Sequence, residues 1–277
     1  MTFDPATDIP DLGGKVIFIT GGTAGLGKQS ILALVKKNPA HVYFSGRDAP
    51  RAAALISEIT AAIPSAQLTF VECNMSSLAS VAKAAKQVTS KTDQLDIMMC
   101  NAGVWTVPPA LTEDGYETQF GINHLSHALL LKLLRPILLR TPDARVSGFP
   151  ASEMRYPQSK LANLIYAAEL ARRYPQLTSV SVHPGIVATD MVLNAPWTMK
   201  LFLKVIQMWT GEAIVKPETG ALNQVWAATA AKTELVNGEY YVPVGKPGKH
   251  TKLSADKKLA EKLWEWTEKE LEGYYLS

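Results

Sequence analysis

The chain has 277 residues and a formal net charge of +3, and 47% of its residues are hydrophobic. This length accommodates one large α/β domain with a full core, and the scattered Lys and Arg residues do not form the basic stripe of a nucleic-acid-binding protein. The first residues lack the apolar core of a signal peptide, and no run of about 18 apolar residues exists, so we expect a cytoplasmic protein without a transmembrane segment.

Apolar runs alternate with helical patterns through the first hundred residues. The runs that read as buried strands lie at 15–20, 41–46, 67–73 and 95–103, and the first three are each followed by a helical segment. Short apolar strands separated by helices are typical of right-handed βαβ units and of one parallel sheet.

The second half of the chain continues this alternation. A long helical stretch at 112–140 precedes a possible fifth strand, ARVSGF, and a helical pattern at 157–175 precedes strands at 178–185 and 239–245. No linker or repeat interrupts the pattern. We therefore predict a single α/β domain over 1–277, a doubly wound parallel sheet (Rossmann fold) with helices on both faces.

The C-terminal stretch at about 254–273 has the pattern of an amphipathic helix. Its Lys and Glu residues are expected to face solvent, whereas Leu259, Leu263, Trp266 and Leu271 are expected to pack on the domain.

Few residues suggest disulfide or metal chemistry. Cys73 and Cys100 each lie inside an apolar strand and are expected to be buried thiols. His124 and His127 are three residues apart, but no carboxylate or cysteine completes a ligand set, so no metal site is predicted.

A glycine-rich loop, TGGTAGLG at 20–27, joins the first strand to the first helix. One glycine permits the tight turn, the second lets the backbone approach a ligand, and the third lets helix and strand pack closely. The free N–H groups of the helix N-terminus suit a pyrophosphate. The loop therefore predicts dinucleotide binding, with contacts from Gly21, Thr23, Gly25, Leu26 and Gly27.

The spacing of this loop is GxxxGxG rather than the usual GxGxxG. Together with NAG at 101–103, YxxSK at 156–160 and HPG at 183–185, it resembles the short-chain dehydrogenase/reductase family over roughly 13–245. The segments GINHLSHALL, QSKLANLIYAAELA and SVSVHPGIVATD resemble the retinol-dehydrogenase-like branch and look most like those of fungal members. The resemblance implies a Rossmann fold, a nicotinamide cofactor and a homodimer or homotetramer.

The end of the second strand bears on the choice between NAD and NADP. An acidic residue there would hold the ribose 2′-hydroxyl and repel a 2′-phosphate, whereas a guanidinium suits the phosphate. This chain has Ser45 and Gly46 followed by Arg47, so we predict NADP(H) rather than NAD. The alternative is that Arg47 is a surface residue paired with Asp48.

The resemblance implies further cofactor contacts. Asn74 stands where the family has an aspartate that accepts a hydrogen bond from the adenine, and its side-chain oxygen can still accept. The adenosine side would contact Asn101, Ala102 and Gly103. The nicotinamide end would contact Pro184, Gly185, Val187 and Thr189, together with Tyr156 and Lys160.

Tyr156 and Lys160 are four residues apart, so they share one helix face. A phenol has a pKa of about 10, which a nearby ammonium and a bound cationic nicotinamide would lower. The pair therefore predicts a general acid for carbonyl reduction, or a base for alcohol oxidation. By resemblance, Asn123 holds a water that relays protons to the lysine. Ser159 is expected to be an ordinary helix hydroxyl.

The resemblance also implies a serine that orients the substrate carbonyl, about a dozen residues before the tyrosine. Arg145 and Val146 look like the start of its strand, but only ten residues separate Arg145 from Tyr156. Ser147 is the best candidate in this short link, and Ser152 would cap the following helix.

Three explanations of the short link remain open. The natural protein carries a serine-bearing stretch that this sequence lacks, or the deletion is real and impairs catalysis, or another hydroxyl, at best that of Ser147, replaces the serine. The first is favoured because a core strand is hard to delete, whereas a loop beside an empty substrate pocket is easily disordered.

The segment at about 190–216 corresponds by resemblance to a substrate lid. It is apolar, with Met191, Trp197, Met199, Leu201, Phe202, Val205, Met208 and Trp209. This composition predicts a bulky, hydrophobic substrate of retinoid, steroid or polyketide type. A role in the core, in a subunit interface or, through Lys200 and Lys204, at a membrane surface is the alternative.

The sequence therefore supports two candidate functions. The first is an NADP(H)-dependent oxidoreductase that interconverts a ketone or aldehyde and an alcohol. The second is a cofactor-binding protein on the same scaffold that is redox-impaired or repurposed, because its serine segment is truncated.

Overall fold

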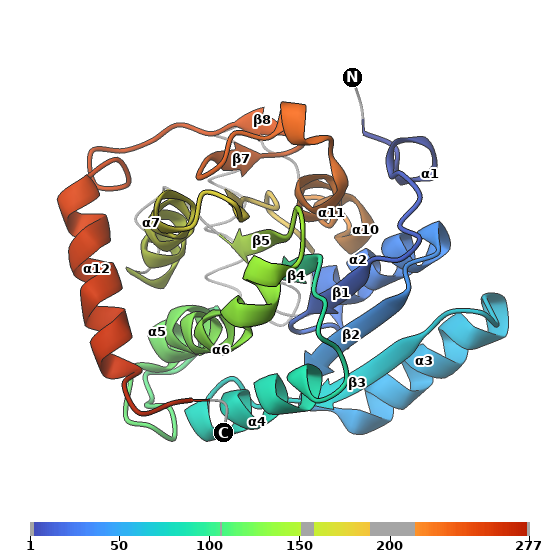
Figure 1. The fold of residues 1–277 in the computed structure, drawn as a ribbon, viewed down its shortest axis with the longest axis horizontal. Coiled ribbons are helices and arrows are strands. Elements are labelled where there is room, and N and C mark those ends of the chain that lie inside the picture. The colour runs from blue at the N-terminus through green and yellow to red at the C-terminus, as the bar shows by residue number, and fades with distance from the viewer. Residues whose placement is uncertain (1–2, 106, 151–157, 189–213, 276–277) are drawn as a thin grey trace.

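The computed structural model describes residues 3–105, 107–150, 158–188 and 214–275. Within them an eight-stranded sheet has the order β3-β2-β1-β4-β5-β6-β7-β8 (Figure 1). Strands β1 to β7 pair in parallel, and β8 pairs with β7 in the antiparallel sense. The strands are β1 (Val16–Ile19), β2 (His41–Gly46), β3 (Leu68–Glu72), β4 (Ile97–Met99), β5 (Arg145–Pro150), β6 (Thr178–Val182), β7 (Tyr240–Val242) and β8 (Lys246–Pro247).

Helices cover both faces of this sheet. The core of one face contains residues of α2 (Gly25–Leu34), α3 (Ala49–Ala62) and α11 (Leu222–Thr229). The core of the other contains residues of α4 (Leu78–Thr89), α6 (Ser126–Arg140), α7 (Gln158–Arg173) and α12 (Lys257–Glu270). The short elements are α1 (Pro5–Asp8), η1 (Val35–Lys37), α5 (Thr118–Phe120), the π-helical turn η2 (Gly121–Leu125), α10 (Pro217–Gly220) and η3 (Lys232–Glu234).

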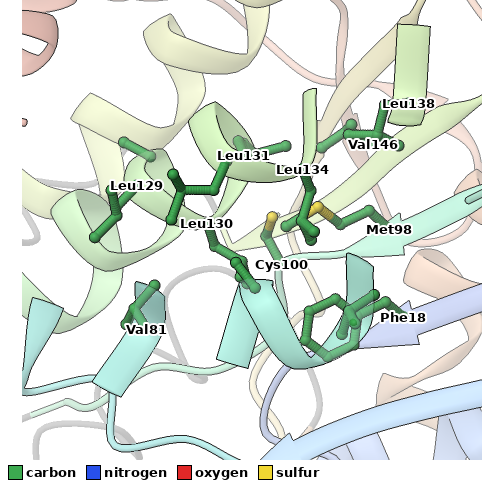
Figure 2. Close-up of a cluster of buried hydrophobic side chains, with 14 of the residues drawn as sticks. Phe18, Val81, Met98, Cys100, Leu129, Leu130, Leu131, Leu134, Leu138 and Val146 are labelled. Atoms are coloured by element: carbon green, nitrogen blue, oxygen red, sulfur yellow. The ribbon is translucent and has the colours of Figure 1, made fainter. Parts of the chain in front are cut away.

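Alternation along the central strands separates the two cores. Phe18 and Met98 pack toward α4 and α6, and Figure 2 shows them beside leucines of α6. Their neighbours Ile17, Ile19 and Met99 pack on the opposite face. Successive side chains of a strand point to opposite faces, so strands that are apolar throughout can bury both faces under helices.

The doubly wound parallel sheet predicted from the sequence is confirmed. The fifth strand also forms, although the short link seemed to leave little room for it. It pairs with β4 and β6, and its register with β6 shifts between Val146 and Phe149. Gly148, with φ +77°, lies at this irregularity. Strand β8 was not predicted, because its two residues are too short to form a pattern.

The predicted C-terminal helix is confirmed, but the prediction of its packing face is partly wrong. Trp264, not Trp266, is the buried tryptophan, with exposed fractions of 5% and 38%. The ring of Trp264 stacks on Tyr166 of α7 with ring centroids 4.9 Å apart. Leu271 is buried as predicted. The buried residues are Ala260, Trp264, Thr267 and Leu271, so the centre of the packing face lies one residue later in the chain than the predicted Leu259, Leu263 and Trp266.

Both cysteines are free and buried, as predicted. Burial raises the pKa of the Cys73 thiol to about 12 and that of Cys100 further, so neither forms a thiolate near neutral pH. None of the helices in the described ranges is long and apolar enough to cross a membrane.

Candidate active site

The glycine loop follows β1 at the centre of the sheet, where the strand order reverses between β1 and β4. Gly21 and Gly25 have φ of +68° and +53°, a region that favours glycine. A Cβ on Gly27 would come within 2.2 Å of the carbonyl oxygen of Gly21. Only glycine permits this approach of α2 to the turn. The turn and the N-terminus of α2 thus form a main-chain cradle that fits a pyrophosphate.

Two other predicted contact residues of the loop lie against neighbouring segments. A Cβ on Gly46 would meet Thr23 at 3.0 Å, so Thr23 lies beside the end of β2. A Cβ on Gly220 of α10 would meet both Leu26 and Val187, at 2.9 and 2.5 Å. The structure therefore brings Leu26 and Val187 together although they are far apart in sequence.

Asn101 holds the glycine turn from the side of β4. Its Nδ2 donates to the carbonyl oxygens of Thr20 and Gly21 at 2.8 and 3.3 Å. Its Oδ1 accepts from Nε2 of Gln224 at 3.1 Å, and Gln224 also donates to Ser30 of α2 at 2.7 Å. Gln224 is buried in α11 and was missed, because a glutamine in a helical pattern carries no signal of its partners.

Arg47 is exposed at the end of β2, as its predicted role requires. The alternative partner, Asp48, is engaged elsewhere. Its carboxylate accepts from the main-chain N of Arg51 at 2.9 Å, caps α3 and pairs with Nε of Arg51 at 3.2 Å. Among the described residues, no carboxylate forms a salt bridge with Arg47.

Asn74 follows β3 and uses both ends of its amide. Its Nδ2 donates to Glu113 at 2.8 Å, and its Oδ1 accepts from the main-chain N of Ser76 at 3.1 Å. An amide oxygen has two lone pairs, so one remains to accept from another donor.

Asn123 lies in the π-helical turn η2, a feature frequent at functional sites. Its fully buried side chain accepts from the main-chain N of Val104 at 2.8 Å and donates to the carbonyl of Val104 at 3.0 Å. It also donates to the hydroxyl of Ser159 at 3.2 Å. Asn123 thus joins the segment after β4 to α7. The hydroxyl of Ser159 accepts from this amide and positions it, so Ser159 has a more specific contact than the ordinary helix hydroxyl that the sequence led us to expect.

Lys160 lies beside the same segment. A Cβ on Gly103 would be 3.7 Å from Nζ of Lys160 and 3.1 Å from Oδ1 of Asn123. Burial lowers the pKa of Lys160 to about 8. The described residues provide no carboxylate in a salt bridge with it. Tyr156 lies outside the described residues.

Ser147 is fully buried in β5, and its hydroxyl has no hydrogen-bond partner among the described groups. Its main-chain carbonyl accepts from Cys100 at 2.8 Å, as part of the sheet. A residue that orients a substrate must reach it, and this hydroxyl faces protein.

The HPG turn after β6 is held in place by its own side chains and by α11. The main-chain N of Gly185 donates to Nδ1 of His183 at 2.8 Å. Asn223 donates to the carbonyls of His183 and Tyr241 at 2.8 and 3.0 Å. Pro184 and Gly185 thus lie at the carboxyl end of the sheet with Val187. Thr189 and the apolar segment at 189–213 lie outside the described residues.

No cluster of three or more His, Cys, Asp or Glu side chains suitable for a metal occurs in the described ranges. The two histidines of the 121–127 region have separate partners. His124 contacts the hydroxyl of Thr267 at 3.1 Å, and His127 that of Thr20 at 2.9 Å. Burial lowers their pKa values to about 3 and about 4, so both are neutral near pH 7.

Comparisons with known proteins place this chain in a family. The family model described as short chain dehydrogenase matches residues 15–198. The chain belongs to the short-chain dehydrogenase/reductase family. A short-chain dehydrogenase/reductase from Armillaria gallica is 34% identical over 298 positions, covering 96% of this chain and 93% of the relative.

Two further similarities fit the motifs. Mouse retinol dehydrogenase 12 is 30% identical, covering 91% of this chain and 84% of the relative, and the chain belongs to the retinol-dehydrogenase-like branch. The structure of a Pseudomonas aeruginosa RhlG/NADP active-site complex has a TM-score of 0.68 at 24% identity, covering 85% of this chain and 96% of that one, and shares the fold.

The first alignment is longer than this chain. Its 298 positions exceed the 277 residues of this chain by 21, so the Armillaria relative has at least that many residues without a counterpart here.

Proposed function

We propose that this protein is an NADP(H)-dependent oxidoreductase that interconverts a ketone or aldehyde and an alcohol on a bulky hydrophobic substrate. The proposal rests on the positions of Lys160 and Asn123. Both side chains lie beside Gly103, at the carboxyl end of β4 and next to the glycine turn. Ligands of doubly wound sheets bind at this edge, where the strand order reverses.

Each of these residues has a separate role in the proposed reaction. When bound, NADPH supplies the hydride for the carbonyl carbon. Tyr156 donates the proton to the developing alkoxide, and in alcohol oxidation it removes that proton. Lys160, with a pKa of about 8, is largely protonated at neutral pH, and its positive charge lowers the pKa of the tyrosine four residues before it. Asn123 and Ser159 hold α7 beside the segment that follows β4.

The preference for NADP rests on Arg47. Its guanidinium is exposed at the end of β2, and the nearby carboxylate of Asp48 is used by α3 and Arg51. A charge-assisted, two-pronged contact with a 2′-phosphate is the chemistry that an arginine supplies best. The RhlG structure, which has the same fold, is a complex with NADP.

The hydrophobic substrate is proposed from the apolar residues at 190–216 and from the similarity to retinol dehydrogenase 12. A second function is favoured by the burial of Ser147 and by the shortened sequence. In that case the protein binds the cofactor but has lost redox turnover, because nothing orients the substrate carbonyl.

The decisive experiment measures NADPH consumption with a panel of bulky ketones, aldehydes and alcohols, and NADPH binding by fluorescence titration. The proposal predicts turnover that Lys160→Met reduces at least about 100-fold, since acid–base catalysis typically contributes that much. Lys83→Met, on the exposed side of α4, is the matched control. Binding without turnover over the whole panel would establish the second function.

The intact mass of the protein isolated from its natural source tests the short link separately. The sequence corresponds to 30.1 kDa. A mass higher by several kilodaltons, with peptides between Arg145 and Tyr156, would mean that the natural protein contains a serine-bearing stretch. A mass of 30.1 kDa would mean that the short link is real.

A further inference from the structure

His127 is a fully buried residue at the start of α6 that the proposed chemistry does not use. Its ring lies between two parts of the site. Nε2 is 2.9 Å from the hydroxyl of Thr20, at the end of β1, and Nδ1 is 3.0 Å from the main-chain carbonyl of Asn123, in η2. The imidazole therefore connects the strand that leads into the glycine turn with the helix that carries Asn123.

The direction of each hydrogen bond follows from the chemistry of the groups. A carbonyl can only accept, so Nδ1 of His127 carries the hydrogen. Burial keeps the ring neutral, so Nε2 is an acceptor and the hydroxyl of Thr20 donates to it. The oxygen of Thr20 in turn accepts from the main-chain N of Ala102 at 2.9 Å. One consistent chain thus runs from Ala102 through Thr20 and His127 to Asn123.

This chain closes a ring with the side chain of Asn123. That side chain bonds both main-chain groups of Val104, while the main chain of Asn123 is bonded by His127. Residues 102–104 are therefore fixed at both ends to the same helical turn. Lys160 lies beside Gly103, in the middle of the fixed segment.

We propose that His127 is a positioning residue that locks the 102–104 segment and the end of β1 to the turn of Asn123, and so sets the surface on which Lys160 and the cofactor lie. The consequence for turnover rests on the proposed function, whereas the consequence for the segment itself does not. Fully satisfied buried hydrogen-bond networks of this kind rigidify the structure around them. Removing one hydrogen bond of the network weakens the others.

The adjoining turn η2 contains a matched control. His124 is also buried and neutral, and its Nε2 contacts the hydroxyl of Thr267 at 3.1 Å. This second histidine–threonine pair faces α12 rather than the glycine turn. Thr20→Val and Thr267→Val therefore each remove one buried hydroxyl that bonds a histidine, and only the first belongs to the proposed lock.

The test follows amide hydrogen exchange in the cofactor-free protein. His127→Leu is expected to accelerate exchange at Ala102 and Val104 about tenfold, which is the effect of losing one typical hydrogen bond. His127→Gln, whose side-chain oxygen can still accept from Thr20, is expected to restore part of the protection at Ala102. Thr267→Val is expected to leave both amides unchanged.

The reciprocal arm keeps the test valid if His127→Leu does not fold. Thr20→Val is expected to accelerate exchange in η2, more than one hundred residues later in the chain. NADPH titration is expected to show about tenfold weaker binding for Thr20→Val and unchanged binding for Thr267→Val.

Wild-type exchange at Ala102 in His127→Leu, or equal effects of the two threonine variants there, would overturn the lock. In a protein that turns over, the lock also predicts that His127→Gln lowers kcat more than it raises KM, because Lys160 is displaced relative to the substrate. A protein without turnover would refute the proposed function, while the exchange results would still decide the role of His127.

Discussion

Lys160 is the residue whose environment departs most from what its motif shows. In YxxSK it is a cation four residues from a phenol, but in the fold it is half-buried beside Gly103, and desolvation lowers its pKa from 10.5 to about 8. A partly desolvated ammonium without a carboxylate in a salt bridge with it, among the described residues, is costly to the folded state.

This cost predicts a pH-dependent stability. The pKa of Lys160 is lower in the folded than in the unfolded protein, so the folded state is penalised below about pH 8 and the penalty disappears as the pH rises to 10.5. Lys160→Met should therefore raise the free energy of unfolding at pH 7 by on the order of 3 kcal/mol, at about 1.36 kcal/mol per pKa unit. That gain should vanish near pH 10.5.

Urea unfolding of the cofactor-free protein at several pH values measures this difference. The exposed Lys83→Met provides the comparison, and its difference from wild type is expected to stay small at every pH. Wild-type and Lys160→Met stabilities that run parallel from pH 7 to 10.5 would contradict the prediction.

Arg47 gives a second prediction at this scale. Arg47→Ala should weaken NADPH binding about 10- to 100-fold while leaving NADH binding nearly unchanged, since hydrogen bonds to charged groups have this strength and only NADPH has the 2′-phosphate. Fluorescence titration with both cofactors measures the ratio. Arg51→Ala, which removes the arginine paired with Asp48, is the control. Equal losses for the two cofactors would refute the phosphate contact.

At the scale of elements, α12 shows how the pattern and the packing can differ. Oε2 of Glu268 lies 3.6 Å from Nζ of Lys132, and its Oε1 lies 3.7 Å from Nη1 of Arg135, both residues of α6. The carboxylate of Glu270 accepts a hydrogen bond from the hydroxyl of Tyr116 at 2.7 Å. These contacts orient the helix so that Trp264 enters the core and Trp266 meets Phe120 edge-on at 5.7 Å.

The two tryptophans therefore predict different costs. Trp264→Ala should lower the free energy of unfolding by about 3–5 kcal/mol, the range for large aromatic residues in a core. Trp266→Ala should cost about 1 kcal/mol or less, because the side chain is 38% exposed. Chemical denaturation at one pH compares them directly. A larger loss for Trp266→Ala would mean that the packing face of α12 is the one indicated by the sequence pattern, and similar losses would contradict the predicted difference.

At the scale of the whole molecule, α12 also restricts how copies can associate. It packs on α7 through Trp264 and on α6 through Glu268, so it occupies the outer side of these two helices. A second copy therefore cannot contact the parts of α6 and α7 that α12 covers.

We propose that the protein is a homodimer or homotetramer, as family resemblance implies. Light scattering coupled to size-exclusion chromatography should give two or four times the chain mass of 30.1 kDa. The mass should not change on moderate dilution, because a stable interface buries well above about 1,000 Å². A mass of one chain would refute the proposal.

The sequence by itself determined the architecture and the place of the glycine turn in it. The centres of KVIFIT and HVYFSG are apolar on both faces, which requires helices on both sides of the sheet, and glycines at 21, 25 and 27 are needed by the turn that follows the first of them. These features are local in the chain, so period, composition and spacing reveal them.

Only the tertiary structure decided which side chains contact one another. It buried Ser147 without a hydrogen-bond partner among the described groups, placed Lys160 beside Gly103, and joined Thr20 to His127 across 107 positions. Such pairings depend on the register of strands and the rotation of helices. A sequence pattern fixes the period of an element but not these two quantities, because they result from the packing of the whole core.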